Sequence, residues 1–456
     1  MNSKILYLKV SKKFYINLII LFLTGSAFAQ NPLIMDQFTA DPTARVFNGK
    51  LYVYPSHDIR CEETQGRPDW FCMPDYHVFS SENLTDWTDH GKILGQENVP
   101  WADSKAYSMW APDAVEKNGK YYFYFPTRTK EASDGEGGFS IGVAIADNPE
   151  GPFVAQPEPI KGVNGIDPNV LIDKDGQAYL YWSQNKVFGA KLKVNMLELA
   201  SEPKIFSELP QKGLIEGPFV FERNGTYYLT YPHVANKTER LEYATGDNPL
   251  GPFIHKGVIM DESVSGTWTN HHSITEYKDQ WILFYHDNDL SPDFDKNRSI
   301  RADSLFFEEN GNIEKVVPTH RGIGKSSAFK EIQFDRYSEK SEEGVEIEFI
   351  DNADTFKGWK LVFTEPNSKV RYNSVDFGKE SPEAVVIKLN VSEAKNSAFE
   401  IRDSEDNLIT KFELNNTEDW QEINVPIQNK ITGTKDLIIQ VLGKGTIEVD
   451  WIKFEK

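Results

Sequence analysis

The segment Asn48-Gly49-Lys50-Leu51-Tyr52-Val53-Tyr54 decides the fold, because its pattern returns along the first two-thirds of the chain. The further copies begin at Asn118, Asp175, Asn224 and Lys278, and the last copy is degenerate. Asn-Gly and Asp-Gly tolerate the positive φ that tight hairpin turns require. The aromatic and β-branched residues that follow fit a pleated surface. Each copy therefore predicts one β-hairpin.

The spacing of these copies predicts how the hairpins are assembled. Successive copies are 70, 57, 49 and 54 residues apart. Four strands with their turns need about that length, and repeats of this period are typical of propeller blades. A second repeated segment supports the blade interpretation. Asp147-Asn148-Pro149-Glu150-Gly151-Pro152-Phe153 is repeated, with one change, as Asp247-Asn248-Pro249-Leu250-Gly251-Pro252-Phe253. We therefore predict an all-β chain with a five-bladed β-propeller over residues 30–325; the alternative is a β-sandwich with insertions.

The pattern changes after Gly322-Ile323-Gly324-Lys325. Short alternating strands follow, such as Val345-Glu346-Ile347-Glu348-Phe349 and Ala384-Val385-Val386-Ile387-Lys388-Leu389. Alternation with period two is the pattern of half-buried strands. We predict a linker at 326–332 and a smaller β-sandwich of the jelly-roll type over 333–456.

The first 29 residues resemble a targeting segment rather than part of the fold. Four lysines precede an apolar stretch, Phe14 to Leu23, that is too short to span a membrane. Ala27-Phe28-Ala29 then forms a small-residue cleavage site. We predict a cleaved signal peptide at 1–29 and a secreted or periplasmic protein; the alternative is a membrane anchor. No later segment is apolar enough to cross a bilayer.

Charge limits the classes of partner. The whole chain carries a formal charge of -20, and loss of the four leader lysines gives -24. Nucleic-acid binding needs a basic face, so we expect no nucleic-acid partner. An acidic surface is compatible with a neutral glycan. Aromatic residues make up 13% of the chain, which a β-rich core explains as well as sugar stacking does.

The chain has two cysteines, Cys61 and Cys72. In an exported protein they could form a disulfide. A zinc site would need further ligands at characteristic spacing, and none stands around them. The sequence leaves a disulfide and two free thiols equally open.

Three carboxylates stand at matching positions of the repeat. Asp41, Asp167 and Glu216 precede their hairpin turns by seven, eight and eight residues, each beside a Pro or Gly. Blades arranged around an axis would bring such residues together at its centre. Inverting hydrolysis of a glycoside needs a general base and a general acid on opposite sides of the sugar. The acid needs a raised pKa, which burial or a neighbouring carboxylate can provide.

With these motifs in place, residues 36–320 resemble glycoside hydrolase family 43, which comprises five-bladed propellers that cleave furanosides and xylosides with inversion. The matching pieces are Asp41-Pro42, Trp110-Ala111-Pro112-Asp113, Asp167-Pro168-Asn169-Val170, Glu216-Gly217-Pro218-Phe219 and Asn270-His271-His272-Ser273. The resemblance implies that Asp41 is the general base, that Glu216 is the general acid, and that Asp167 tunes and orients the acid.

The same resemblance suggests roles for three further residues. His271 is similar to an axial histidine that contacts a central, structural calcium ion or its waters; the alternative is a core histidine. Arg298 resembles an arginine that reaches the acid or the sugar, and a surface salt bridge is the alternative. Trp110 could form an apolar wall of the sugar pocket or belong to the core.

The C-terminal part resembles carbohydrate-binding modules of the family 6 type, through Tyr372-Asn373-Ser374-Val375-Asp376-Phe377-Gly378 and Val449-Asp450-Trp451-Ile452-Lys453-Phe454. The expected protein is a monomeric, exo-acting glycosidase that removes a terminal α-L-arabinofuranosyl or β-D-xylosyl unit from plant-type polysaccharide or oligosaccharide. Galactofuranosyl or β-1,3-galactosyl units on the same scaffold, or a non-catalytic sugar-binding propeller, are the alternatives.

Overall fold

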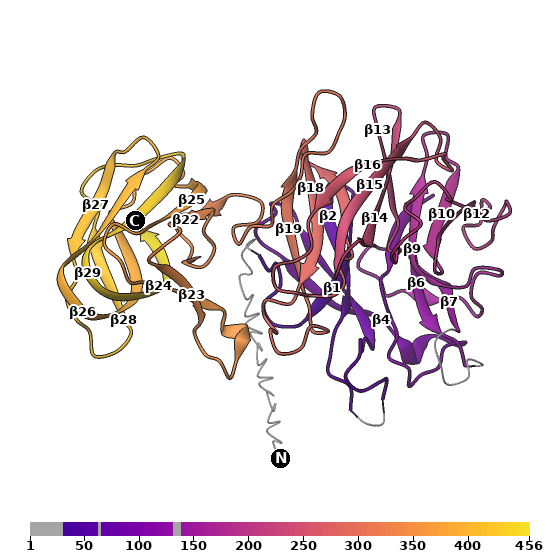
Figure 1. The fold of residues 1–456 in the computed structure, drawn as a ribbon, viewed down its shortest axis with the longest axis horizontal. Coiled ribbons are helices and arrows are strands. Elements are labelled where there is room, and N and C mark those ends of the chain that lie inside the picture. Colours follow the sequence, from indigo (N-terminus) through magenta and orange to yellow (C-terminus); the bar gives the residue numbers. More distant parts are fainter. Residues whose placement is uncertain (1–30, 63–64, 131–137) are drawn as a thin grey trace, which may run out of the picture.

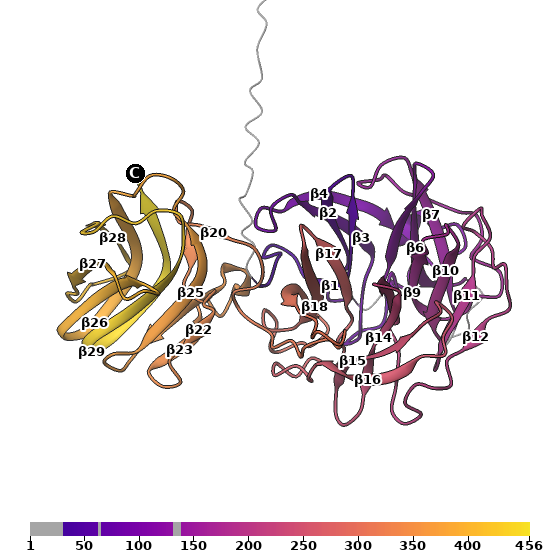
Figure 2. The same cartoon turned by 90° about the horizontal axis from the view of Figure 1, so that it is seen from above.

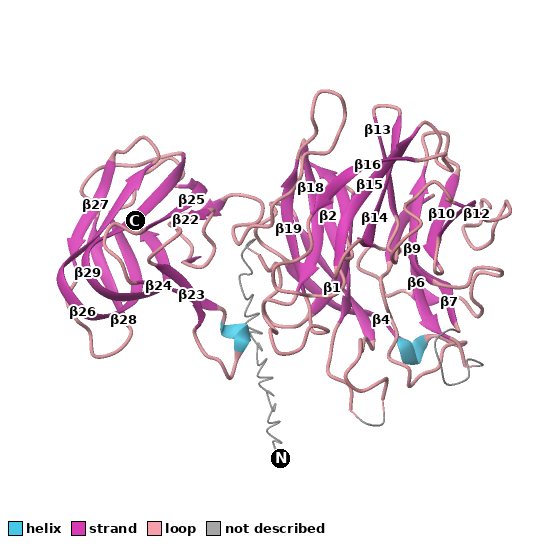
Figure 3. Ribbon diagram, viewed as in Figure 1, coloured by secondary structure: helices cyan, strands magenta, loops and turns pink. Residues whose placement is uncertain are grey.

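The computed structural model describes residues 31–62, 65–130 and 138–456, and it is almost entirely β-structure (Figure 3). The described helices are two short 3-10 turns, η1 (Gln96–Asn98) and η2 (Thr355–Lys357). Two bodies lie side by side, the larger built from the N-terminal part and the smaller from the C-terminal part (Figures 1 and 2). The signal peptide predicted at 1–29 lies outside the described residues.

The larger body consists of five separate sheets, each formed by strands that follow one another in the chain. The sheets are β1 (Thr39–Phe47), β2 (Lys50–His57), β3 (Asp75–Ser81), β4 (Thr88–Gly95); β5 (Asp113–Lys117), β6 (Lys120–Arg128), β7 (Phe139–Ala146), β8 (Val154–Ala155); β9 (Ile166–Ile172), β10 (Ala178–Ser183), β11 (Val187–Lys191), β12 (Lys204–Ile205); β13 (Phe219–Arg223), β14 (Thr226–Val234), β15 (Glu239–Gly246), β16 (Ile254–Met260); and β17 (Ser273–Tyr277), β18 (Gln280–Asp287), β19 (Ser299–Leu305). These are the five predicted blades.

The predicted turns join the first two strands of every blade. Asn48, Asn118 and Asn224 have φ between 52° and 56°, and the glycine after each is also positive. The degenerate fifth copy makes the same turn with Lys278 and Asp279, at φ 51° and 61°. Two consecutive residues of positive φ match the twist of the flanking strands, so the dipeptide sets the register in these four blades. In the third blade only Gly176 of the dipeptide has positive φ, at 81°, within a longer turn between Ile172 and Ala178.

Polar side chains connect the innermost strands of neighbouring blades. The Asp113 carboxylate accepts hydrogen bonds from the Thr43 hydroxyl of β1 at 2.7 Å and from the Asn169 amide of β9 at 3.0 Å. The side-chain oxygen Oδ1 of Asn169 accepts from the Val220 N–H at 2.8 Å, and the Ser273 hydroxyl accepts from the Ala44 N–H at 3.0 Å. Since buried polar groups must be paired, these bonds hold the ring of inner strands together.

The ring closes through the chain before β1. The Leu33 N–H donates to the Ile300 carbonyl of β19 at 2.9 Å, and the Thr39 N–H donates to the Arg298 carbonyl at 2.9 Å. The Asn31 side chain contacts both Ala302 and Asp303. The start of the described chain therefore lies beside the last blade, which has three strands of its own.

The smaller body is a β-sandwich with one hydrophobic core. Its strands are β20 (Ser326–Ser327), β21 (Ile332–Gln333), β22 (Glu339–Lys340), β23 (Val345–Phe349), β24 (Trp359–Phe363), β25 (Lys369–Asp376), β26 (Ala384–Asp403), β27 (Leu408–Glu413), β28 (Gln421–Pro426) and β29 (Thr434–Glu455). The long strands β26 and β29 pair along both halves and pass from one layer to the other, with breaks between Ser392 and Ala398. At the bend a Cβ on Gly443 would meet the Asn396 carbonyl at 2.1 Å, so glycine is required there.

The segment predicted as a linker, 326–332, is part of this sandwich. β20 pairs in parallel with β25, and β21 begins at Ile332 and pairs with β29. Ala328 and Ile332 are fully buried in the sandwich core. The composition change that suggested a linker reflects short edge strands, which carry too few residues for a visible alternation.

The two bodies are in direct contact. The Phe356 ring of η2 packs on the Phe38 ring at 4.7 Å between centroids, three residues before Asp41. Lys330 forms an ion pair with Asp86 at 2.6 Å. Phe38 directly precedes β1, so the sandwich contacts the segment that leads into the strand of the first predicted carboxylate.

Cys61 and Cys72 form a disulfide, with 5.8 Å between their Cα atoms. The bond closes the long connection between β2 and β3. Within the residues that the structure describes, no helix is long and apolar enough to cross a membrane.

Candidate active site

Three β-bulges present the predicted carboxylates. The register of β1 and β2 shifts between Ala40 and Thr43, so that Asp41-Pro42 forms the bulge. The register of β9 and β10 shifts at the equivalent place, around Asp167-Pro168. Asp41 and Asp167 have φ of 50° and 57°. Proline cannot donate to the ladder and is found at bulges, and bulges re-aim side chains beside active sites. The repeated Asp-Pro therefore turns each carboxylate out of its sheet.

Glu216 comes from the same place in the fourth blade. Ile215 bridges to His233 while Phe219 pairs with Thr230, which leaves one extra residue on the Glu216 side. Here Gly217 has the positive φ, at 53°. A Cβ at Gly217 would lie 2.9 Å from the His271 Nδ1 atom. Glycine thus allows the Glu216 segment to approach the axis.

The carboxylates meet in one cavity of about 190 Å³. Acidic residues, aromatic residues and basic residues line it together: Asp41, Trp70, Phe71, Met73, Trp110, Ala111, Ile166, Asp167, Glu216, Glu239, Trp268, Thr269, His271 and Arg298. All six residues that the sequence analysis singled out are in this set. The cavity combines aromatic side chains with a few charged groups, which is the composition of a small-molecule binding pocket.

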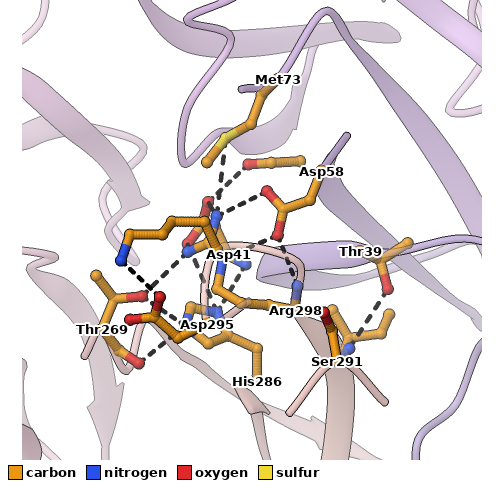
Figure 4. Close-up of polar contacts among 12 residues, drawn as sticks. Thr39, Asp41, Asp58, Met73, Thr269, His286, Ser291, Asp295 and Arg298 are labelled. Atoms are coloured by element: carbon orange, nitrogen blue, oxygen red, sulfur yellow. Dashed lines mark hydrogen bonds and ion pairs between the residues drawn. The ribbon is translucent and has the colours of Figure 1, made fainter. Parts of the chain in front are cut away.

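Asp41 is held by an arginine (Figure 4). The Arg298 NH1 group donates to Asp41 Oδ1 at 2.9 Å, and the Ser56 hydroxyl donates to Oδ2 at 2.8 Å. Burial alone would raise the pKa of Asp41, but the Arg298 charge and the Ser56 hydrogen bond hold that pKa below its ordinary value. The Asp41 N–H donates to His286 Nδ1 at 3.0 Å, so this nitrogen carries no proton. Asp41 is therefore an ionised carboxylate in a fixed orientation.

Arg298 is itself anchored on its other side. Its Nε and NH2 groups donate to the two oxygens of Asp58, each at 2.9 Å, and its guanidinium lies 4.8 Å from the centre of the Phe71 ring. The sequence analysis predicted that Arg298 reaches the acid or the sugar. The structure places its guanidinium on Asp41, so Arg298 stabilises the ionised form of this carboxylate.

Glu216 has the opposite environment. Burial raises the pKa of Glu216 well above its ordinary value, and the adjacent Glu239 carboxylate raises it further. Glu239 lies on β15 and accepts a hydrogen bond from the Asn270 N–H at 2.7 Å. The pKa of Glu239 is raised to about 7, chiefly by burial, although its hydrogen bonds with the Asn270 N–H and with Glu216 act in the opposite direction. The shared proton therefore resides on Glu216, which is the acidic form that a proton donor needs.

Asp167 contacts the segment that carries the acid. Its Oδ2 accepts a hydrogen bond from the Gly217 N–H at 2.9 Å, which fixes the residue next to Glu216. Burial, and then the Glu216 charge, raise the pKa of Asp167 well above its usual range. Asp167 thus fixes the position of the segment that carries Glu216, through its bond with Gly217.

Sequence reasoning missed Glu239. Glu239 is the first residue of β15, the third strand of its blade, and no turn motif precedes it. The pairing of β15 with β14 brings it to the axis. His271 lines the cavity, and burial lowers its pKa so that the ring is neutral. His272 points into the blade, with Nε2 2.6 Å from the Thr230 hydroxyl. Trp110 borders the cavity and packs against Phe139 at 4.6 Å.

Comparison with known proteins agrees with this geometry. The sequence profile of glycosyl hydrolases family 43 matches residues 29–313, which is more than half of the chain. The chain belongs to glycoside hydrolase family 43. The profile of the family 6 carbohydrate binding modules matches residues 337–456.

Several relatives of this family 43 enzyme are known. It is 40% identical over 336 residues to a xylosidase/arabinosidase 43A of Humicola insolens, an alignment that covers 63% of this chain and 99% of that protein. It is also 36% identical to a family 43 β-xylosidase/α-arabinofuranosidase from a compost metagenome, whose calcium-free structure was solved with xylotriose. The two structures superpose with a TM-score of 0.56, and the match covers 63% of this chain and 97% of the other.

The two-domain arrangement also has a structural counterpart. An arabinoxylan arabinofuranohydrolase from Bacillus subtilis has a TM-score of 0.55 to this chain and covers 94% of it and 99% of its own length. At 21% identity this similarity concerns the fold alone. Family 43 thus accounts for the propeller, and the family 6 module accounts for the sandwich.

A groove of about 1210 Å³ continues from the pocket of this family 43 enzyme. Trp70, Phe71, Trp110, Ile166 and Glu216 border both the pocket and the groove. Glu216 therefore stands at the junction, where a leaving group would pass from the pocket into the groove. Trp70 and Phe71 directly precede Cys72, so the disulfide fixes the loop that forms one wall.

Breaking this disulfide should weaken substrate binding. We expect the Cys61→Ser/Cys72→Ser variant to raise KM several-fold, because Trp70 and Phe71 lose their fixed position, while kcat changes less. Steady-state kinetics of the variant and of the dithiothreitol-treated wild type would measure this. Unchanged KM in both would show that the loop holds its position without the bond.

The Glu216–Glu239 pair predicts the alkaline limb of the pH profile. Activity requires protonated Glu216, and the negative charge of Glu239 raises the pKa of Glu216. In Glu239→Gln this charge is absent, so Glu216 loses its proton at lower pH and the alkaline limb of kcat/KM should move down by about one unit. Profiles are to be recorded with a chelator present. Glu222→Gln, near the end of β13 in the same blade, where the carboxylate pairs with Lys174, should leave the limb in place. An unmoved limb in Glu239→Gln would refute the coupling.

Proposed function

We propose that this enzyme is an exo-acting, inverting glycoside hydrolase that releases a terminal β-D-xylosyl or α-L-arabinofuranosyl unit from plant-type polysaccharide or oligosaccharide. The observation that carries the proposal is the placement of Asp41, ionised, and Glu216, protonated, in one cavity. The names of the Humicola insolens and metagenomic relatives support this sugar class. The cavity volume of about 190 Å³ suits one sugar unit rather than a chain.

The base side of the reaction follows from the Asp41 environment. A water molecule lies between Asp41 and the anomeric carbon, and Asp41 accepts a proton from it as the oxygen attacks. Arg298 keeps Asp41 ionised before the attack. Once Asp41 is protonated the Asp58 charge still pairs with Arg298, so the buried guanidinium is never left without an anion.

The acid side follows from the Glu216 environment. Glu216 donates its proton to the glycosidic oxygen as the bond to the anomeric carbon breaks, and the leaving group departs into the groove that Glu216 borders. The carboxylate that forms on Glu216 lies beside Glu239 and Asp167. Burial and the Glu239 carboxylate raise the pKa of Glu216, so reprotonation from solvent completes the cycle. Direct displacement by water inverts the anomeric configuration.

A calcium ion on the propeller axis fits part of this site. His271 offers a neutral imidazole to the cavity, and Glu239 offers Oε1, which has no other hydrogen-bond partner among the described residues. We propose that His271, with Glu239, would hold the ion. When bound it would supply a fixed positive charge at the base of the pocket.

The test is a panel of nitrophenyl glycosides combined with product stereochemistry. We expect hydrolysis of β-D-xyloside and α-L-arabinofuranoside, with proton NMR showing the inverted anomer first. A retained anomer, or no hydrolysis with binding on a glycan array, would overturn the proposal. Hydrolysis of the galactofuranoside alone would show that the enzyme acts on galactofuranosyl units instead.

We also propose that the protein is exported as a monomer, secreted or periplasmic, with residues 1–29 removed. The leader-like composition supports export. The N-terminal sequence of the protein from its native cells, together with its elution volume on a sizing column, would test both statements.

A further inference from the structure

A second group of metal-ligating side chains lies on the first blade, outside the cavity described above. His57 at the end of β2, and Asp75 and His77 on β3, each offer one coordinating atom, and these atoms lie within 4.8 Å of one another. Ser56 pairs with Tyr76 in the ladder, so His57 lies beside Asp75. Side chains two apart on a strand share a face, which places His77 on the same face. No step of the proposed hydrolysis uses these residues.

The three side chains are partly buried but open to solvent. The exposed fractions of the His57, Asp75 and His77 side chains are 23%, 16% and 18%. The His57 and His77 rings lie 5.4 Å apart between centroids. An ion could therefore reach them from solvent without a change in the fold.

A further carboxylate orients one of the histidines. Asp89 on β4 contacts His77 Nδ1 at 3.3 Å, and Asp89 is itself held by the Gln37 amide at 3.2 Å and the Gly91 N–H at 2.7 Å. A carboxylate on one imidazole nitrogen fixes the ring and leaves the other nitrogen free, which is the usual outer partner of a metal-bound histidine. Asp89 thus presents His77 Nε2 to the cluster.

We propose that His57, Asp75 and His77 form a binding site for a divalent transition-metal ion of the zinc class. Two imidazoles and one carboxylate are a ligand set that zinc accepts, whereas calcium takes about six to eight ligands that are mainly oxygen, which a set with two nitrogen atoms among three does not provide. Ligand atoms around a tetrahedral zinc ion lie about 3.3 Å apart, so small rotations of the side chains close the set on the ion. Solvent supplies the fourth ligand.

The position of the site links it to the catalytic pocket. His57 is followed by Asp58, whose carboxylate holds Arg298 beside Asp41. An ion at His57 would fix the end of β2 and with it the Asp58 end of this ion pair. The bound form should therefore unfold at a higher temperature than the metal-free form.

Isothermal titration of the chelator-treated full chain with Zn²⁺ tests the proposal. We expect one saturable site, a higher Tm with Zn²⁺, and no competition from excess Ca²⁺. His57→Asn and His77→Ala should each abolish the site, and Asp89→Asn should weaken it about 10–100-fold. His90→Asn is the matched control, because His90 lies on β4 of the same blade and contacts Ser80 at 2.7 Å instead.

Two results would overturn the proposal. One is the absence of saturable Zn²⁺ binding, which would make the cluster a hydrogen-bond network only. The other is undiminished binding in the His57→Asn/His77→Ala double variant, which would place the ion elsewhere, for example at His271. The Tm of each variant in metal-free buffer shows that it is folded.

Discussion

Replacing Asp41 with asparagine is expected to lower kcat by about 10²–10⁴-fold, the contribution of a general base. Asparagine keeps the shape of the side chain but cannot accept the proton of the attacking water. The fold should survive, because Arg298 retains its bonds to Asp58. Without the Asp41 charge, the buried Arg298 cation and Asp58 anion form a pair with no net charge. Initial rates on an aryl xyloside, with Tm as the check on folding, measure both effects.

The loss in Asp41→Asn should be the same for good and poor leaving groups, since water activation does not depend on the group that departs. Asp36→Asn, at an exposed position five residues earlier, should retain full activity. Turnover near the wild-type value in Asp41→Asn would remove this residue from the base role.

Replacing Glu216 with glutamine should give a loss of similar size that depends on the leaving group. A dinitrophenyl leaving group departs without protonation, so its hydrolysis should be nearly retained. Xylobiose needs the proton and should be slowed by about 10²–10⁴-fold. Rates for a series of aryl glycosides of decreasing acidity measure this dependence.

The Asp41→Asn variant serves as the matched comparison for Glu216→Gln, because it should show a flat dependence on the same series. An equal loss on all substrates in Glu216→Gln would mean that the residue does not protonate the leaving oxygen. The alkaline limb of the pH profile should also disappear in Glu216→Gln, because its amide does not titrate.

The blade pattern could be predicted from the sequence because the turns that set it are local. Asn48-Gly49 and the copies at Asn118 and Asn224 adopt the backbone angles that their residue types favour, and the copies at Asp175 and Lys278 form turns at the same place in their blades. The positions of Asp41, Asp167 and Glu216 on the axis could be predicted for the same reason, since each stands at a fixed distance from its turn.

Residues that reach the site through pairing between strands could not be predicted. Glu239 comes to Glu216 only through the register of β14 and β15, and the contact of Arg298 with Asp41 depends on how the fifth blade meets the first. Likewise, the linker predicted at 326–332 was wrong because β20 and β21 gain their stability from distant strands, β25 and β29. Asp41 and Arg298 lie 257 residues apart in the chain, and no local sequence pattern indicates their contact.

The packing of Phe356 on Phe38 bears on how such enzymes can be recombined. A foreign accessory module joined after the propeller would leave Phe38 uncovered, next to the segment that presents Asp41. Chimeras made by domain exchange should therefore carry η2 of the original module, or an aromatic residue at the same place, if turnover is to be preserved.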